Sequence, residues 1–112
     1  MNAYSELLEK IQIKRATEVP EATLADFYRE MYPNRAGFLK KHWRWLYRVG
    51  EFSESYPPLV ALLEGKVIGH VAAIPIILKS GNHERFAAWG VDGGVLPPYR
   101  TCGIGSKLMQ IW

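Results

Sequence analysis

A glycine-containing turn near the end of the chain constrains the fold more than any other segment. An apolar, strand-like run ends at Val95–Leu96, a helix-like run follows Ser106, and between them lies the pattern Arg100-x-x-Gly103-x-Gly105. The first turn of a helix carries backbone N–H groups that lack partners inside the helix, and the helix dipole adds partial positive charge there. Glycine lets an anion approach the backbone closely because it has no Cβ. The turn therefore predicts a binding site for phosphate or diphosphate.

The same segment resembles the signature of a known family. It reads Val95-Leu96-Pro97-Pro98-Tyr99-Arg100-Thr101-Cys102-Gly103-Ile104-Gly105. This is similar to the Arg/Gln-x-x-Gly-x-Gly/Ala motif that follows a strand ending in Val-x-Pro-x-Tyr in the GNAT superfamily of N-acetyltransferases. The resemblance implies that acetyl-CoA binds here, with its diphosphate on backbone N–H groups of the turn and its pantetheine arm along the strand. The residues implied to bind it are Gly94, Val95, Leu96, Arg100, Thr101, Cys102, Gly103, Ile104, Gly105 and Ser106.

Two other phosphate-binding motifs fit the turn less well. A dinucleotide-binding fold requires a third glycine three residues after the second, where this chain has Leu108. The Walker motif is excluded because the sequence contains no Gly-Lys-Ser/Thr. Gly-x-Gly by itself also occurs in plain turns that start a helix. The preceding strand, the arginine and the amphipathic run that follows favour the diphosphate site.

Length and composition limit the remaining classes of protein. The 112 residues predict a single domain over 1–112, and 48% hydrophobic residues suffice for a core. No apolar run is long enough to span a membrane, and Met1–Lys10 lacks the apolar core of a signal peptide. One cysteine excludes an internal disulfide framework and is typical of the reducing cytoplasm. The net charge of +3 suits an anionic cosubstrate and does not require nucleic acid.

Hydrophobic periodicity predicts an α/β (α+β) fold with a mainly antiparallel sheet and flanking helices. Apolar residues at i, i+3, i+4 and i+7 from Leu24 to Met31 are typical of one helix face, and Pro33 ends that helix. Glu64-Gly65 and Gly81-Asn82 predict tight turns between strands. The expected elements are a strand over 11–16, helices over 24–31 and 36–49, strands over 59–64, 67–78 and 86–96, and a helix that begins near Gly103.

The resemblance covers the chain from about Ile11 and corresponds to roughly the N-terminal two-thirds of a GNAT-like domain. Such a domain continues with another strand, a helix and usually further strands, so we expect a partial domain that is truncated after the motif helix. Leu108, Met109, Ile111 and Trp112 would then lack part of their packing surface, and exposed apolar patches usually bind a partner. We therefore expect self-association as a homodimer or a chain that is one piece of a larger protein. A shortened reading frame is the alternative.

Asp92 is the first candidate for a general base. By resemblance, the chemistry is direct attack of an amine on the acetyl thioester, which requires a base, a donor to the carbonyl oxygen and an acid for the thiolate. Asp92 lies in the strand that leads to the turn, where a carboxylate is unfavourable unless it is paired or faces a cleft. The alternative is a structural aspartate bonded to neighbouring backbone or to Arg100. A backbone N–H near Val95 is the carbonyl donor that the resemblance implies.

Other residues capable of chemistry have structural interpretations that we favour. His70 lies in mid-strand, where a hydrogen-bonded core histidine is more common than a catalytic one. Cys102 at a helix start is a candidate reactive thiol, although its backbone N–H is expected to matter more. Tyr99 is expected to pack beside the turn. The sequence has no Cys/His/Asp/Glu cluster with the spacing of a metal site, so no metal is expected.

The segment Lys40–Arg48 combines basic and aromatic residues. It could form a nucleic-acid or membrane surface, but helical spacing favours core aromatics with solvated cations opposite. By resemblance, Trp43, Arg44 and Trp45 border an acceptor pocket. The sequence therefore predicts an acetyl-CoA-dependent N-acetyltransferase that acts on an unknown primary amine. The alternative is a catalytically incomplete CoA-binding or dimerising module, and a nucleic-acid binder is least favoured.

Overall fold

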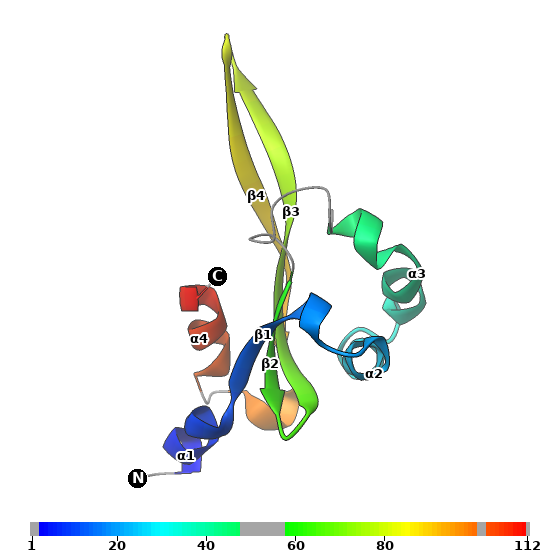
Figure 1. The fold of residues 1–112 in the computed structure, drawn as a ribbon, viewed down its shortest axis with the longest axis vertical. Helices are drawn as coiled ribbons and strands as arrows, with labels where there is room; N and C mark the ends of the chain where they lie inside the picture. The colour runs from blue at the N-terminus through cyan, green and yellow to red at the C-terminus, as the bar shows by residue number, and fades with distance from the viewer. Residues whose placement is uncertain (1–2, 48–57, 101–102, 112) are drawn as a thin grey trace.

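The computed structural model describes residues 3–47, 58–100 and 103–111 (Figure 1). Two short 3-10 segments, η1 and η2, accompany the helices and strands. The order is α1 (Ala3–Lys10), β1 (Gln12–Arg15), η1 (Ala16–Glu18), α2 (Glu21–Met31), α3 (Ala36–Leu46), β2 (Leu59–Leu63), β3 (Lys66–Ser80), β4 (His83–Val95), η2 (Pro97–Tyr99) and α4 (Ile104–Ile111). The predicted mixture of an antiparallel sheet and flanking helices is confirmed.

The sheet has four antiparallel strands in the order β1-β2-β3-β4. A two-residue loop joins β2 to β3, since Leu63 pairs with Lys66. Glu64 and Gly65 in that loop have φ angles of 51° and 81°, the left-handed conformation that such loops require. The predicted hairpin is confirmed, and β4 lies at one edge of the described sheet.

The β3–β4 hairpin is longer than expected. Pairing continues to Ser80 and His83, and Gly81 begins the loop with a φ of 61°. The apolar pattern fades after Leu78, so the periodicity places the strand ends too early. The loop at Gly81 instead allows polar residues to continue the strand pairing, and Lys79 and Glu84 form an ion pair at 3.4 Å. The hairpin projects well beyond the helices (Figure 1).

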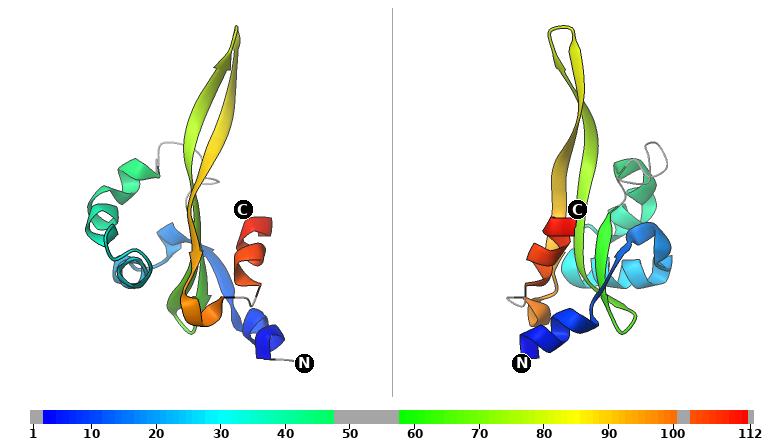
Figure 2. Two further views of the ribbon diagram at one scale, coloured as in Figure 1. Left: turned by 180° about the vertical axis from the view of Figure 1, so that it is seen from behind. Right: turned by 60° about the vertical axis from the view of Figure 1, so that its left-hand side comes forward.

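Helices cover both faces of the sheet, with α2 and α3 on one face and α4 on the other (Figures 1 and 2). Gly69 and His70 are consecutive in β3, and successive strand residues face opposite sides. The His70 ring stacks on Phe27 of α2, with ring centres 5.8 Å apart. On the other face, a Cβ at Gly69 would lie 3.1 Å from Leu108 of α4. The glycine therefore permits the close approach of α4 to β3.

The two helices between β1 and β2 confirm the predicted helical segments. α2 ends at Met31 before Pro33, and α3 ends at Leu46, with the residues from 48 to 57 outside the described part of the chain. Leu39 and Tyr47 are fully buried, whereas Trp45 is 64% exposed. The interpretation of the segment as a core-facing helix is confirmed, apart from Trp45. No helix among the described residues is long and apolar enough to cross a membrane.

Two features of the ends differ from the expectation. The pattern did not predict α1, whose leucines pack against the core, because so short a helix depends on tertiary packing rather than on its own propensity. Leu108 does not lack a packing surface, since it is 1% exposed against β3. The side chains of Met109, Ile111 and Trp112 lie outside the described residues, so the expected apolar patch there stays a prediction.

Candidate functional site

A β-bulge interrupts β4 shortly before the glycine turn. The register with β3 passes from His70↔Gly94 to Ala72↔Val91, so that Asp92 and Gly93 are accommodated opposite a single residue. Asp92 has a φ of 52°, in the left-handed region that side chains other than glycine rarely adopt. Bulges of this kind bend a strand and redirect its side chains, often beside active sites. The bulge thus determines where Asp92 points.

The Asp92 carboxylate is held from two sides. Its side chain is 6% exposed and forms an ion pair with Arg35, which lies between α2 and α3. The hydroxyl of Tyr47 donates to the other carboxylate oxygen at 2.5 Å. The hydrogen bond to Asp92 raises the pKa of Arg35, while burial and then the bond to Asp92 raise the pKa of Tyr47. The sequence predicted a paired structural aspartate as one alternative, with neighbouring backbone or Arg100 as its partner. The partner in the structure is Arg35.

His70 is a buried residue of a hydrogen-bonded chain. Its Nδ1 lies 2.9 Å from the backbone oxygen of Asp92, and its Nε2 lies 2.8 Å from the hydroxyl of Tyr28. A carbonyl can only accept, so Nδ1 carries the proton and Nε2 accepts from Tyr28. Trp43 donates in turn to the Tyr28 oxygen at 2.9 Å. Burial lowers the pKa of His70 to about 4, and the favoured interpretation as a core histidine is confirmed.

Arg100 follows β4 and folds back onto it. Its Nε donates to the carbonyl of Val95 at 2.8 Å, and its guanidinium approaches the sulfur of Met31 at 3.9 Å. Leu96 follows Val95 in the chain, and its N–H is bonded to the carbonyl of Ile68 in β3 at 2.9 Å. Part of the backbone at the end of β4 is therefore already engaged within the chain.

The start of α4 lies beside the end of β4. Gly103 has a φ of 86°, which explains the glycine at this position, and its carbonyl accepts from the N–H of Lys107 in the first turn of the helix. A Cβ at Gly105 would lie 3.9 Å from the Val95 side chain. The structure therefore places the N-terminus of α4 next to the end of β4. Of the predicted binding residues, Gly94, Val95, Leu96, Arg100, Gly103, Ile104, Gly105 and Ser106 are described, whereas Thr101 and Cys102 lie outside the described residues.

The end of α2 packs against the backbone of β4 at Gly94. A Cβ at that glycine would lie 2.5 Å from the terminal methyl of Met31 and 3.1 Å from the hydroxyl of Tyr32. The Tyr32 hydroxyl is buried and has no hydrogen-bond partner among the described residues. Burial raises its pKa. The sequence pattern indicates only that Tyr32 lies near the end of a helix. No local pattern relates Tyr32 to Gly94, which is more than sixty positions away.

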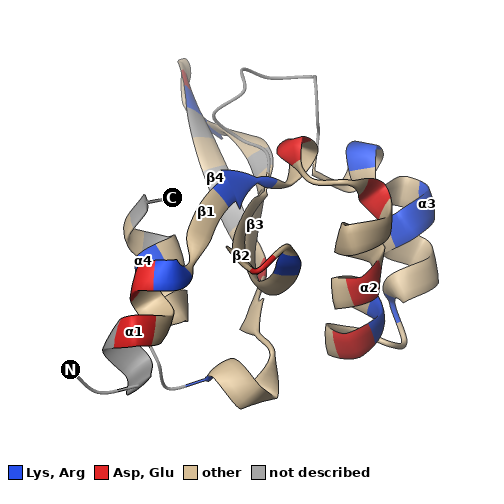
Figure 3. Cartoon of the chain, turned by 60° about the horizontal axis from the view of Figure 1, so that its bottom comes forward, with Lys and Arg blue, Asp and Glu red and all other residues tan. Residues whose placement is uncertain are grey.

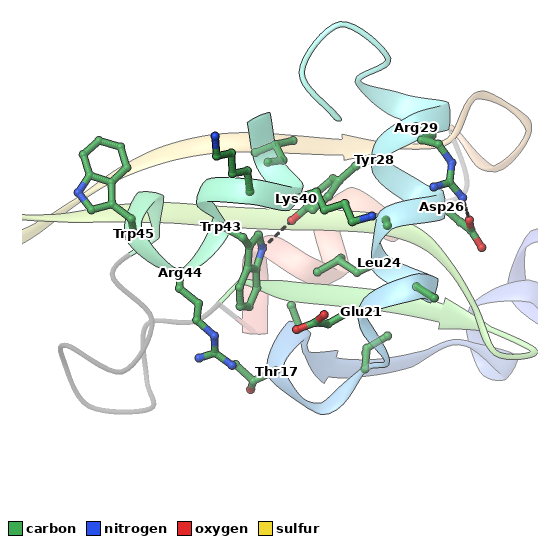
Figure 4. Close-up of a pocket in the computed structure, with 16 residues that line it drawn as sticks. Thr17, Glu21, Leu24, Asp26, Tyr28, Arg29, Lys40, Trp43, Arg44 and Trp45 are labelled. Atoms are coloured by element: carbon green, nitrogen blue, oxygen red, sulfur yellow. Dashed lines mark hydrogen bonds and ion pairs between the residues drawn. The ribbon is translucent and has the colours of Figure 1, made fainter. Parts of the chain in front are cut away.

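A cavity of about 610 Å³ is lined by residues of η1, α2 and α3 (Figure 4). Trp43, Arg44 and Trp45 line it, with acidic residues on α2 and basic residues on α3 (Figure 3). Among the described residues that line it, neither Asp92 nor any residue of the glycine turn occurs. The structure therefore brings the three predicted acceptor residues together but in a different place from Asp92. The described residues contain no cluster of three or more metal-ligating side chains.

The family model of the "Acetyltransferase (GNAT) family" matches residues 17–111. The chain belongs to the GNAT acetyltransferase family. This confirms the family suggested by the segment from Val95 to Gly105. No curated protein matches the sequence.

Solved GNAT structures share the fold. An aminoglycoside acetyltransferase from an uncultured soil metagenomic sample, in complex with sisomicin, is 23% identical with a TM-score of 0.57, covering 94% of this chain and 68% of that one. A GNAT acetyltransferase from Brucella melitensis in complex with acetyl-CoA is 22% identical with a TM-score of 0.52, over 90% and 65%. An aminoglycoside 6'-N-acetyltransferase complexed with coenzyme A is 19% identical with a TM-score of 0.54, over 89% and 52%. The chain thus spans between half and about two-thirds of these proteins.

Proposed function

We propose that this GNAT chain is an acetyl-CoA-dependent N-acetyltransferase that acetylates a primary amine. The observation that carries the proposal is the order of the bulged strand β4, η2 and the start of α4 at Gly103, in a chain that the family model matches from residue 17 to residue 111. Similar proteins were solved with coenzyme A and with acetyl-CoA. Together these findings support a site for an extended, anionic thioester.

The strand contributes the part of the site that takes the pantetheine arm. Within the described sheet β4 pairs only with β3, so its other edge offers backbone groups to an amide-bearing ligand. Gly94 and Val95 are the residues proposed to pair with the pantetheine arm. The N–H of Leu96 is already bonded to the carbonyl of Ile68, so Leu96 contributes its buried side chain and not its N–H. The Val95 carbonyl becomes available once Arg100 releases it. Arg100 would then be directed to the diphosphate.

The turn contributes the anion site. Thr101, Cys102 and the residues from Gly103 to Ser106 are proposed to hold the diphosphate through backbone N–H groups. The left-handed φ of Gly103 and the missing side chain of Gly105 beside Val95 support a close approach of the ligand. Arg100 adds the cation. Bound acetyl-CoA supplies the acetyl group as a thioester.

Asp92 remains the proposed general base. Arg35 and Tyr47 each occupy one lone pair of its oxygens, and a carboxylate offers about four such positions, so the role requires an amine to reach a remaining position on a side chain that is 6% exposed. His70 is unsuited to the role because both ring nitrogens are engaged and the ring is buried. The aminoglycoside in one similar protein supports a small amine as the proposed acceptor class. The members of an acceptor panel should therefore include aminoglycosides.

The test measures binding and transfer on the same protein. Acetyl-CoA should raise the melting temperature, with about 2.7 kcal/mol of stabilisation at a concentration one hundred times its Kd. Thiol release in the presence of an amine panel should then reveal turnover, and D92N should reduce it without changing the Kd for CoA. Failure of millimolar acetyl-CoA to stabilise the protein would overturn the proposal.

A dimerising, catalytically incomplete module is the second candidate. It is favoured by Ile77 and Leu78, which are 52% and 55% exposed on the projecting hairpin, and by the free edge of β4 in the described sheet. Stabilisation by acetyl-CoA without thiol release from any amine, together with a dimer in sedimentation, would support this candidate instead.

A further inference from the structure

One peptide group of the β4 bulge is held by a side chain from the neighbouring strand. The Nδ1–H of His70 donates to the carbonyl of Asp92 at 2.9 Å. In a trans peptide the carbonyl and the following N–H point in opposite directions, and the structure has no cis peptide among its described residues. The N–H of Gly93 therefore points away from His70.

The space beside Gly93 is open. Gly93 is exposed, and apart from its chain neighbours no atom of the described residues would lie within 4 Å of a Cβ built there. The register of β4 with β3 passes from Gly94 to Val91 and assigns Gly93 no partner residue. An acyl group that lies along the outer edge of β4 can therefore approach Gly93 without meeting a side chain at that position.

The side chain that sets this geometry is itself fixed. His70 is 1% exposed, and its ring lies against Phe27, Tyr28 and Tyr47, with ring centres 5.8, 5.2 and 6.1 Å away. Tyr28 donates to Nε2 and itself accepts from Trp43, which leaves the proton on Nδ1. The chain of bonds from Trp43 to the Asp92 carbonyl thus selects one tautomer and one ring orientation.

We propose that His70 is a positioning residue for acetyl transfer, which directs the Gly93 N–H toward the oxygen of the bound thioester by holding the Asp92 carbonyl. The inference rests on the proposed function. His70 transfers no proton in this role. When the amine attacks, negative charge develops on that oxygen, and a donor that is already oriented stabilises it without reorganisation.

Two variants separate the two bonds of the ring. The amide nitrogen of asparagine can reach the position of Nδ1, so H70N can keep the donor to the Asp92 carbonyl. The longer glutamine side chain reaches the position of Nε2, so H70Q can keep the bond to Tyr28 but loses that donor. We expect H70Q to lose about 100-fold in kcat, with the Kd for CoA unchanged, and H70N to lose far less. Equal kcat values for two folded variants would overturn the inference.

A measurement on the unaltered protein covers the case in which the variants do not fold. Nitrogen-15 NMR should show His70 protonated on Nδ1, and the Gly93 amide proton should move downfield with acetyl-CoA but not with CoA, which lacks the acetyl oxygen. An Nε2-protonated ring, or an identical Gly93 response to both ligands, would refute the role of His70. If neither ligand binds, the proposed function fails instead, which is a distinct result.

Discussion

Lowering the pH from about 7.5 to about 5 should destabilise the fold through His70. Burial lowers the pKa of this histidine from 6.5 to about 4 in the folded protein. Between these values the unfolded chain binds the proton and the native state does not, so stability rises with pH. The contribution is fully present above pH 6.5 and is lost as the pH falls toward 4. It amounts to about 3.4 kcal/mol in total, of which about 2 kcal/mol is lost by about pH 5.

Urea unfolding at several pH values, followed by tryptophan fluorescence and circular dichroism, measures this contribution. The control is H70N, which does not titrate but leaves Tyr28, Tyr47 and Asp92 in place around the site. The free energy of unfolding of the unaltered protein should fall between pH 7.5 and 5 by about 2 kcal/mol more than that of H70N. Parallel curves for the two proteins would refute the assignment of a buried, neutral His70. So would a pKa near 6.5 for His70 measured by NMR in the folded protein.

Three substitutions test the packing and the hydrogen bonds around the site. G69A places a Cβ 3.1 Å from Leu108 and should cost about 1–3 kcal/mol in urea unfolding. The control G90A, whose Cβ would meet no described atom within 4 Å, should change the free energy of unfolding by about 0.5 kcal/mol at most. Equal effects of the two substitutions would contradict the packing of α4 on β3. Y28F removes the donor to His70 and should cost about 1–3 kcal/mol in thermal unfolding, and an unchanged melting temperature would exclude that bond. R35A removes the ion pair with Asp92 and should cost about 1.5–3 kcal/mol in urea unfolding; an unchanged free energy of unfolding would contradict the pairing of this buried carboxylate.

The sequence predicted those elements whose conformation depends on residues close together in the chain. The stripe from Leu24 to Met31 marks α2 because one face of that helix packs on the sheet, and Glu64-Gly65 marks a hairpin because its two φ angles are positive. The start of α4 could be predicted because the left-handed backbone at Gly103 favours glycine. These features each depend on residues close together in the sequence.

The contacts around Asp92 could not be predicted in the same way. Arg35 and Asp92 are 57 positions apart, and His70 and Asp92 are 22 positions apart. Their meeting depends on the strand register and on the bulge, which no periodicity in this chain specifies. The sequence selected Asp92 because a carboxylate in a strand needs a partner, but the identity of that partner follows only from the packing of α2 and α3 on the sheet.

The projecting β3–β4 hairpin implies a gradient of local stability along one pair of strands. Around Ile77 and Leu78 the side chains are exposed, whereas Val71 and Ala72 near the bulge are buried. Amide hydrogen exchange should therefore begin at the Gly81 tip and advance inward, with the backbone at Val71 and Ala72 exchanging last. The outer ladder can unzip while the end that carries the bulge stays closed.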